Sequence, residues 1–136
     1  MNFIFNCINV FAFLGWLLLF VAPSWKNTQF IINNGILVTL ASVYFVFVAR
    51  GISTFNLLDF SSFDKVKILF SNDYALITGW IHYLIFDLFV GLYIVRKSIE
   101  IGISRWIYSL ILPFTFLFGP IGFLIFNFVS LSKSKY

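Results

Sequence analysis

Long runs of apolar residues alternate with short charged segments along the chain. Residues 3–22 and 30–49 are each twenty residues long without Asp, Glu, Lys or Arg. As helices, both would be about 30 Å long, which is the thickness of a bilayer's hydrocarbon core. Residues 75–95 and 106–128 are two further apolar runs of similar length. The pattern predicts an all-α integral membrane protein, a single domain over residues 1–136, with four transmembrane helices at about 3–22, 30–49, 75–95 and 106–128.

The segment between the second and third runs has a different character. Ser53–Asp73 mixes large apolar side chains with five charged residues, so it is too polar to cross a bilayer. Its regular apolar spacing predicts an amphipathic interfacial helix that ends near Phe70, with Ser61 and Asp64 as the capping pair at its start. In the fourth run, Pro113 and Pro120 predict a bend in a single helix.

Composition strengthens the membrane prediction and excludes several functions. The chain is 61% hydrophobic and 10% charged, whereas soluble domains are about 25% charged. Lipid is therefore the expected solvent and the first partner. The net charge of +4 is scattered over connections and the tail, which predicts no nucleic-acid partner. One histidine and one cysteine, Cys7, cannot complete a zinc site or an intramolecular disulfide, so we expect no metal and no cofactor.

The first two spans carry small or polar residues at helical spacing. Asn2, Asn6 and Asn9 share one face, which we expect to turn toward other helices or a ligand. In the second span, Gly35, Thr39 and Ser42 form a face that would let another helix approach closely.

Charge does not decide the orientation of the predicted four-span arrangement. Four spans would place both termini on one side, and we expect no cleavable signal peptide or transit leader, because Met1–Phe5 carries no side-chain cation. The basic residues then divide almost evenly between the two sides. Arg50, Lys65, Lys67, Lys133 and Lys135 lie opposite Lys26, Arg96, Lys97 and Arg105.

The third run contains the chain's clearest chemical candidates, His82 and Asp87. An Asp at the centre of a membrane helix costs roughly 3 kcal/mol, so such a residue is a functional candidate by default. On one helix the two side chains would be about 140° and 7.5 Å apart. They cannot form a direct pair, and each needs a partner on another helix or a shared ligand. Trp80, Tyr83 and Gly91 share the face of Asp87.

Three stretches together resemble the family named after the abscisic-acid-deficient-four protein of plants. They are Gly-Trp-Ile-His-Tyr-Leu-Ile-Phe-Asp-Leu-Phe-Val-Gly at 79–91, Leu-Phe-Gly-Pro-Ile-Gly-Phe-Leu at 117–124, and the amphipathic stretch from Val66 to Phe70 that leads into Ala75. The resemblance implies an integral membrane protein of carotenoid and xanthophyll metabolism in photosynthetic membranes. Plant relatives are associated with forming neoxanthin from violaxanthin, an isomerisation that opens an epoxide and leaves an allene. We expect a bacterial member, in a plasma or thylakoid membrane.

Three functions are compatible with these residues. The first is an isomerase acting on a carotenoid-like polyene, in which Asp87 is the proton donor and His82 the acceptor, or the reverse. The expected substrate-binding residues are Trp80, Tyr83, Gly91, Gly119 and Pro120. The second is a non-catalytic pigment-binding or assembly protein, in which the same groups only join helices. The third is a proton-coupled carrier. A homo-oligomer or another membrane protein as partner stays open.

Overall fold

The computed structural model describes residues 1–51 and 56–133, and all of its regular secondary structure there is helical. The start of the predicted connection, at Ser53, and the end of the tail, 134–136, lie outside the described residues. The elements in chain order are α1 (Asn2–Val21), α2 (Lys26–Phe30), the π-helix η1 (Ile31–Leu37), α3 (Val38–Gly51), the 3₁₀ turn η2 (Leu57–Phe60), α4 (Phe63–Phe70), α5 (Asp73–Glu100), α6 (Arg105–Leu117) and α7 (Gly119–Lys133).

Within the described residues, three helices are long and apolar enough to cross a membrane. They are α1, the continuous helix Lys26–Gly51 formed by α2, η1 and α3, and α5. Their positions coincide with the first three predicted spans. The class of all-helical membrane protein is confirmed with them.

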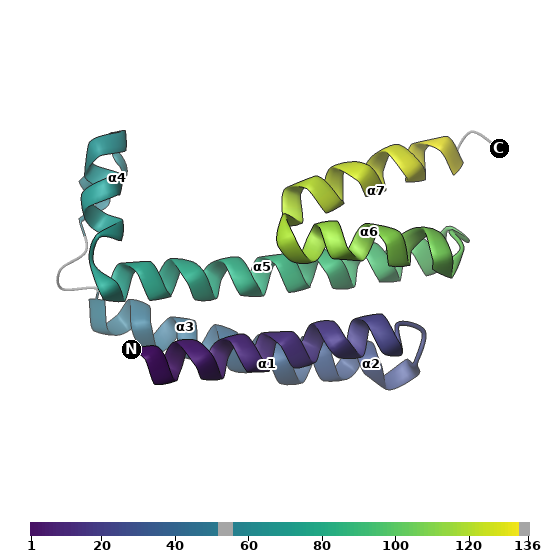
Figure 1. Cartoon of the computed structure of the whole chain (residues 1–136), viewed down its shortest axis with the longest axis horizontal. Helices are drawn as coiled ribbons and strands as arrows, with labels where there is room; N and C mark the ends of the chain where they lie inside the picture. Colours follow the sequence, from purple (N-terminus) through teal and green to yellow (C-terminus); the bar gives the residue numbers. More distant parts are fainter. Residues whose placement is uncertain (52–55, 134–136) are drawn as a thin grey trace.

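The central helix of the bundle is α5, which packs against α1, α3, α6 and α7 (Figure 1). Two glycines allow α1 and α5 to approach closely. A Cβ on Gly91 would lie 2.6 Å from Trp16 Cη2, and one on Gly15 would lie 2.7 Å from Leu88 Cδ2. Trp16 is only 2% exposed, so this contact has no room to relax.

The predicted packing of the second span is wrong on one face. Gly35, Thr39 and Ser42 are exposed, and nothing in the described chain lies within 4 Å of a Cβ on Gly35. The buried face consists of bulky residues, among them Ile32, Ile36, Leu40 and Phe47. This helix therefore packs against its neighbours through bulky apolar side chains and not through its small residues.

The predicted fourth transmembrane helix is not confirmed, because the chain breaks and reverses at Phe118. Its backbone, with φ −148° and ψ 77°, leaves the helical region. Gly119 precedes Pro120, which disfavours a helical backbone there, and a proline is tolerated in a helix's first turn because it needs no N–H donor. The sequence therefore ends one helix and starts another, in place of the predicted bend.

The two short helices form a hairpin, with α7 running back beside α6 (Figure 1). Gly122 packs directly against Thr115 without space for a Cβ. With 13 and 15 residues, the arms are about 20 and 22 Å long, short of the roughly 30 Å hydrocarbon core. Neither arm is therefore long enough to cross the hydrocarbon core by itself.

The ends of the hairpin lie at the same end of the bundle as the C-terminus of α1. Arg105 donates a hydrogen bond to the Val21 carbonyl at 3.1 Å, and Lys133 donates one to the Gly102 carbonyl at 3.4 Å. Of the described cations, this end holds Lys26, Arg96, Lys97, Arg105 and Lys133, while the other holds Arg50, Lys65 and Lys67. Among the described residues, the near-even division expected from four spans thus becomes five basic side chains against three.

At the less basic end, α4 stands across the axis of the bundle (Figure 1). The helix ends at Phe70 as predicted, but its N-cap is Ser62, which accepts a hydrogen bond from the Lys65 N–H, and not Ser61. Ser61 instead donates to the Leu58 carbonyl at the end of η2. The Phe70 ring packs on Gly79 and so anchors α4 to α5.

Candidate functional site

Asp87 lies where α6 ends and α7 begins. Its side chain projects from α5, is 6% exposed, and accepts a hydrogen bond from the backbone N–H of Gly119. Gly119 is the first residue of α7, and a side chain there would collide with the carboxylate. Asp87 therefore caps α7 from another helix, at the end where the helix dipole favours a negative charge.

Tyr83, one turn earlier on α5, forms a hydrogen bond on the other side of the break. Its hydroxyl donates to the carbonyl oxygen of Leu117 at 2.8 Å, and Leu117 is the last residue of α6. Carbonyls in the last turn of a helix lack partners within that helix. Backbone groups exposed at membrane depth must find partners in the protein, and α5 supplies one for each half-helix.

One oxygen at this site is left over. Asp87 Oδ2 is buried and has no hydrogen-bond partner among the described residues. The Tyr83 hydroxyl lies beside the carboxyl, but its single proton is donated to Leu117. A buried oxygen without a partner is costly in any protein. Oδ2 is therefore the atom at which a ligand's hydroxyl or a transferable proton would find an open acceptor.

A groove passes beside Tyr83 and Leu117. It has a volume of about 400 Å³ and runs between α1, α5 and the end of α6. Its walls include Asn9, Phe13, Trp80, Tyr83, Phe116 and Leu117. Trp80 Nε1 donates to Asn9 Oδ1 at 3.0 Å, which confirms for Asn9 that the amide face turns toward another helix. The groove is apolar, with polar groups at few points, as ligand sites typically are.

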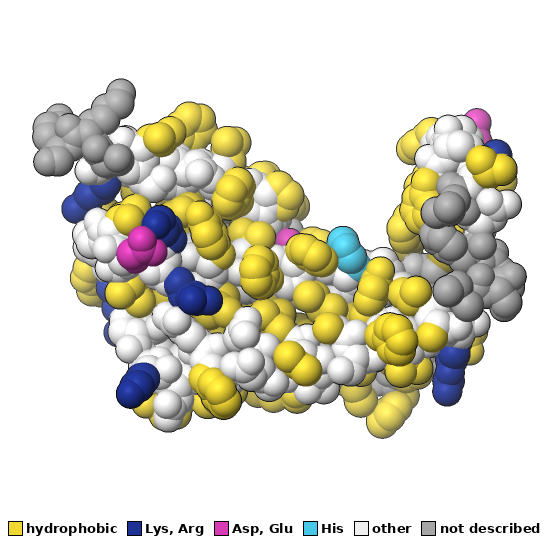
Figure 2. All heavy atoms as spheres, turned by 180° about the vertical axis from the view of Figure 1, so that it is seen from behind, with side chains coloured by type: hydrophobic (Ala, Val, Ile, Leu, Met, Phe, Trp, Pro, Cys, Tyr) yellow, Lys and Arg dark blue, Asp and Glu magenta, His cyan; other side chains and the backbone are white. Residues whose placement is uncertain are grey.

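His82 lies on another side of α5. Its ring is exposed and contacts Tyr44 of α3 and Phe86, at centroid distances of 5.9 and 4.5 Å. Figure 2 shows the histidine in the hollow that separates the α6–α7 hairpin from the region of α4. As helical geometry requires, no hydrogen bond joins His82 to Asp87 within the described chain.

The structure brings together some predicted binding residues and separates others. Trp80 and Tyr83 line the groove with their rings 5.2 Å apart, and Gly119 contacts Asp87. Pro120 is exposed in the first turn of α7. Gly91 instead packs on Trp16, so it is a helix contact.

Sequence reasoning missed the Leu117 carbonyl and Phe116. A backbone acceptor has no residue signature, and the only signal was the Gly-Pro pair that marks a helix start. The described residues contain no group of three His, Cys, Asp or Glu side chains able to hold a metal.

The fold and the site define an all-helical membrane protein in which a central helix presents a buried carboxyl to a helix break. The chain belongs to the ABA DEFICIENT 4-like family, whose model matches residues 3–126. The resemblance drawn from the sequence is thereby confirmed. No curated protein and no solved structure matched the chain. Family membership and the apolar helices together fit a membrane protein of carotenoid-related metabolism.

Proposed function

We propose that this protein is a membrane isomerase that acts on a carotenoid-like polyene by acid–base chemistry. The observation that carries the proposal is Asp87 Oδ2, a buried carboxylate oxygen without a partner among the described residues. It lies one helical turn from Tyr83, which lines an apolar groove. A polyene enters from the bilayer, and its polar end group lies beside Asp87 and Tyr83. The groove volume of about 400 Å³ suits one end group, with the rest of the chain in lipid.

The chemistry needs an acid at an oxygen and a base at a carbon. In opening an epoxide to an allene, the acid protonates the epoxide oxygen as the carbon–oxygen bond breaks. The base removes a proton from the adjacent polyene carbon, so the product is an isomer and no electrons are gained or lost. Asp87 in its protonated form is the proposed donor and His82 the acceptor, and the two roles can be exchanged. Because His82 lies on another side of α5, this step requires the end group to reach across α5 so that it contacts both side chains.

A second function is favoured by a specific observation. Asp87 and Tyr83 close the two half-helix ends, which is a structural task that needs no catalysis. In this alternative, the chain is a non-catalytic pigment-binding or assembly protein, and the carboxylate only holds the hairpin in place.

Expression in a carotenoid-producing host separates the two functions. Asp87→Asn keeps an oxygen that can cap α7 but removes the transferable proton. For an isomerase, this variant should insert, retain pigment and form at least a hundredfold less product, because general acid catalysis contributes about 10²–10⁴-fold. Asp73→Asn, the same change in the first turn of α5, is the matched control and should form product at the wild-type rate.

Two further variants identify the roles. Asp87→Ala removes the cap as well and should lower accumulation in the membrane, whereas His82→Gln should insert normally and lose product. Full product formation by Asp87→Asn would exclude the acid role. A wild-type protein that retains pigment but converts none would establish the non-catalytic function.

We further propose that α4 lies in the membrane interface of a bacterial plasma or thylakoid membrane. None of its residues is buried, and Phe63 and Ile68 are 78% and 71% exposed. Its position across the bundle axis would place these side chains among lipid headgroups. Trp replacing Phe63 should show blue-shifted fluorescence in vesicles, and unchanged emission on vesicle insertion would place α4 in water.

A further inference from the structure

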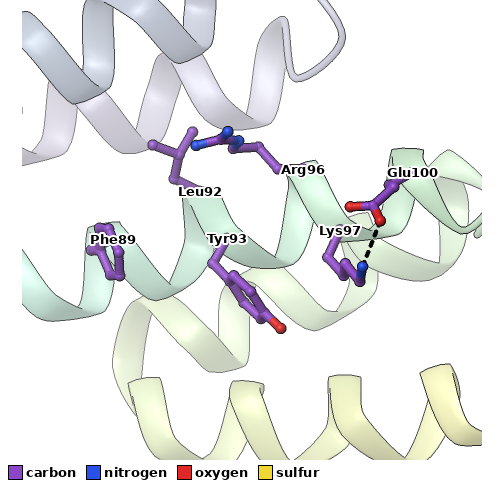
Figure 3. A pocket seen from close by; sticks show the side chains of 6 residues that line it. All are labelled: Phe89, Leu92, Tyr93, Arg96, Lys97 and Glu100. Atoms are coloured by element: carbon purple, nitrogen blue, oxygen red, sulfur yellow. Dashed lines mark hydrogen bonds and ion pairs between the residues drawn. The ribbon is translucent and has the colours of Figure 1, made fainter.

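A second groove, separate from the Asp87 site, lies at the basic end of α5. It has a volume of about 340 Å³ and is lined by Phe89, Leu92, Tyr93, Arg96, Lys97 and Glu100. Arg96 directly follows the apolar run 75–95, so the groove extends from the edge of the hydrocarbon core into the headgroup region. Figure 3 shows Arg96 and Leu92 pointing to one side of α5, and Tyr93 and Lys97 pointing to the other, toward α7.

The charges in this groove leave one cation uncompensated. Lys97 forms an ion pair with Glu100 at 2.6 Å. Arg96 is exposed and makes no hydrogen bond or ion pair with any described residue. The lining therefore carries one net positive charge, which matches the single negative charge of a phosphodiester. A guanidinium also suits phosphate geometrically, because its planar donors can contact two oxygens at once.

The deeper part of the groove is apolar. Phe89 is 50% exposed, and the Tyr93 ring contacts Phe123 and Phe126 of α7 at centroid distances of 6.2 and 5.9 Å. Phe89 and Arg96 are seven residues apart, about 10 Å along the axis. A soluble anion would leave this apolar part unused, whereas an acyl chain would cover it.

We propose that this groove binds one anionic phospholipid, with its phosphate on Arg96 and an acyl chain along Phe89 and Tyr93. The basic end of the bundle then faces the cytoplasmic leaflet, where anionic lipids attract basic groups close to membrane helices. The site is independent of the proposed isomerase, because Arg96 lies nine residues beyond Asp87, about 13 Å along α5.

Native mass spectrometry of the purified full chain in detergent, titrated with phosphatidylglycerol or phosphatidylcholine, tests the site. The wild type should bind one phosphatidylglycerol in preference to phosphatidylcholine. Arg96→Gln should weaken phosphatidylglycerol binding roughly fivefold, because one cation near a membrane contributes about 1 kcal/mol. Glu100→Gln should strengthen binding by a similar factor, since it removes a carboxylate and frees Lys97. This opposite sign cannot arise from misfolding.

The control is Lys26→Gln, which removes a cation at the same end but outside the groove and should leave binding unchanged. Equal losses in Lys26→Gln and Arg96→Gln would show diffuse attraction and overturn the proposal. Phosphatidylglycerol binding by Arg96→Gln with the affinity of the wild type would also overturn the proposal. Displacement of the lipid by inorganic phosphate at equal concentration would identify a free-anion site in place of a lipid site.

Discussion

The Tyr83 hydroxyl donates a hydrogen bond to the Leu117 carbonyl at 2.8 Å, across 34 residues of sequence. Leu117 ends α6, so a side chain of the central helix supplies the partner that the broken helix lacks. Four residues further along α5, Asp87 supplies the complementary acceptor to Gly119. The spacing matters, because residues four apart on a helix lie on one face. One face of α5 thus fixes both sides of the helix break.

Removing the Tyr83 hydroxyl should destabilise the hairpin. Tyr83→Phe leaves the Leu117 carbonyl without this donor, and a hydrogen bond between membrane helices contributes about 0.6 kcal/mol on average and up to about 1.7 kcal/mol. The variant should unfold at lower temperature in detergent. Tyr74→Phe is the control, because the Tyr74 hydroxyl makes no hydrogen bond to the described chain and the residue is 51% exposed. Equal midpoints for the two variants would mean that water or detergent replaces the Tyr83 hydroxyl.

Gly122 should tolerate no side chain. A Cβ there would lie 2.6 Å from the Thr115 Cα, and because that atom is backbone, α6 and α7 would have to separate. Overpacking of this kind typically costs about 1–3 kcal/mol. Gly122→Ala should therefore lower the unfolding midpoint in a chemical denaturation series.

Gly35→Ala is the matched control for Gly122→Ala. Both glycines are helical, but nothing described lies within 4 Å of a Cβ on Gly35. Alanine is the better helix former by about 1 kcal/mol, so Gly35→Ala should be neutral or stabilising. If Gly35→Ala lowers the unfolding midpoint as much as Gly122→Ala does, the result argues against the close contact between α6 and α7.

The hydrogen bond between Trp80 and Asn9 should couple α1 to α5. A double-mutant cycle with Trp80→Phe and Asn9→Leu isolates this pair from the loss of ring packing. Hydrogen bonds between membrane helices contribute about 0.6 kcal/mol on average and up to about 1.7. We expect a coupling energy in that range from unfolding measurements. A value indistinguishable from zero would mean that the two side chains act independently.

The hairpin predicts that the two ends of the chain lie on opposite sides of the membrane. In a Cys7→Ser background, single cysteines at Asn27 and Ser132 should react with a membrane-impermeant maleimide from one side. A cysteine at Ser71 should react from the other. If Ser132→Cys reacts from the same side as Ser71→Cys, the last helices cross the membrane and the four-span arrangement predicted from the sequence is right.

Sequence alone determined the features that depend on local composition and helical periodicity. The long apolar runs located α1, the helix of α2, η1 and α3, and α5, because spanning a bilayer requires about 20 apolar residues wherever they pack. The single carboxylate inside an apolar run identified Asp87. The 100° step between residues was enough to separate His82 from Asp87 on their shared helix.

Tertiary structure decided the path of the chain beyond the helix break and the face that each helix buries. Gly119 and Pro120 show that a helix ends, but the break alone does not determine the direction of the next helix. That direction depends on α5, where Tyr83 and Asp87 meet backbone groups more than thirty residues away. Tertiary packing also decides that the face of Gly35 is exposed. Small residues permit a close approach, but in this chain the bulkier side chains of Ile32, Ile36 and Leu40 are the ones that are buried.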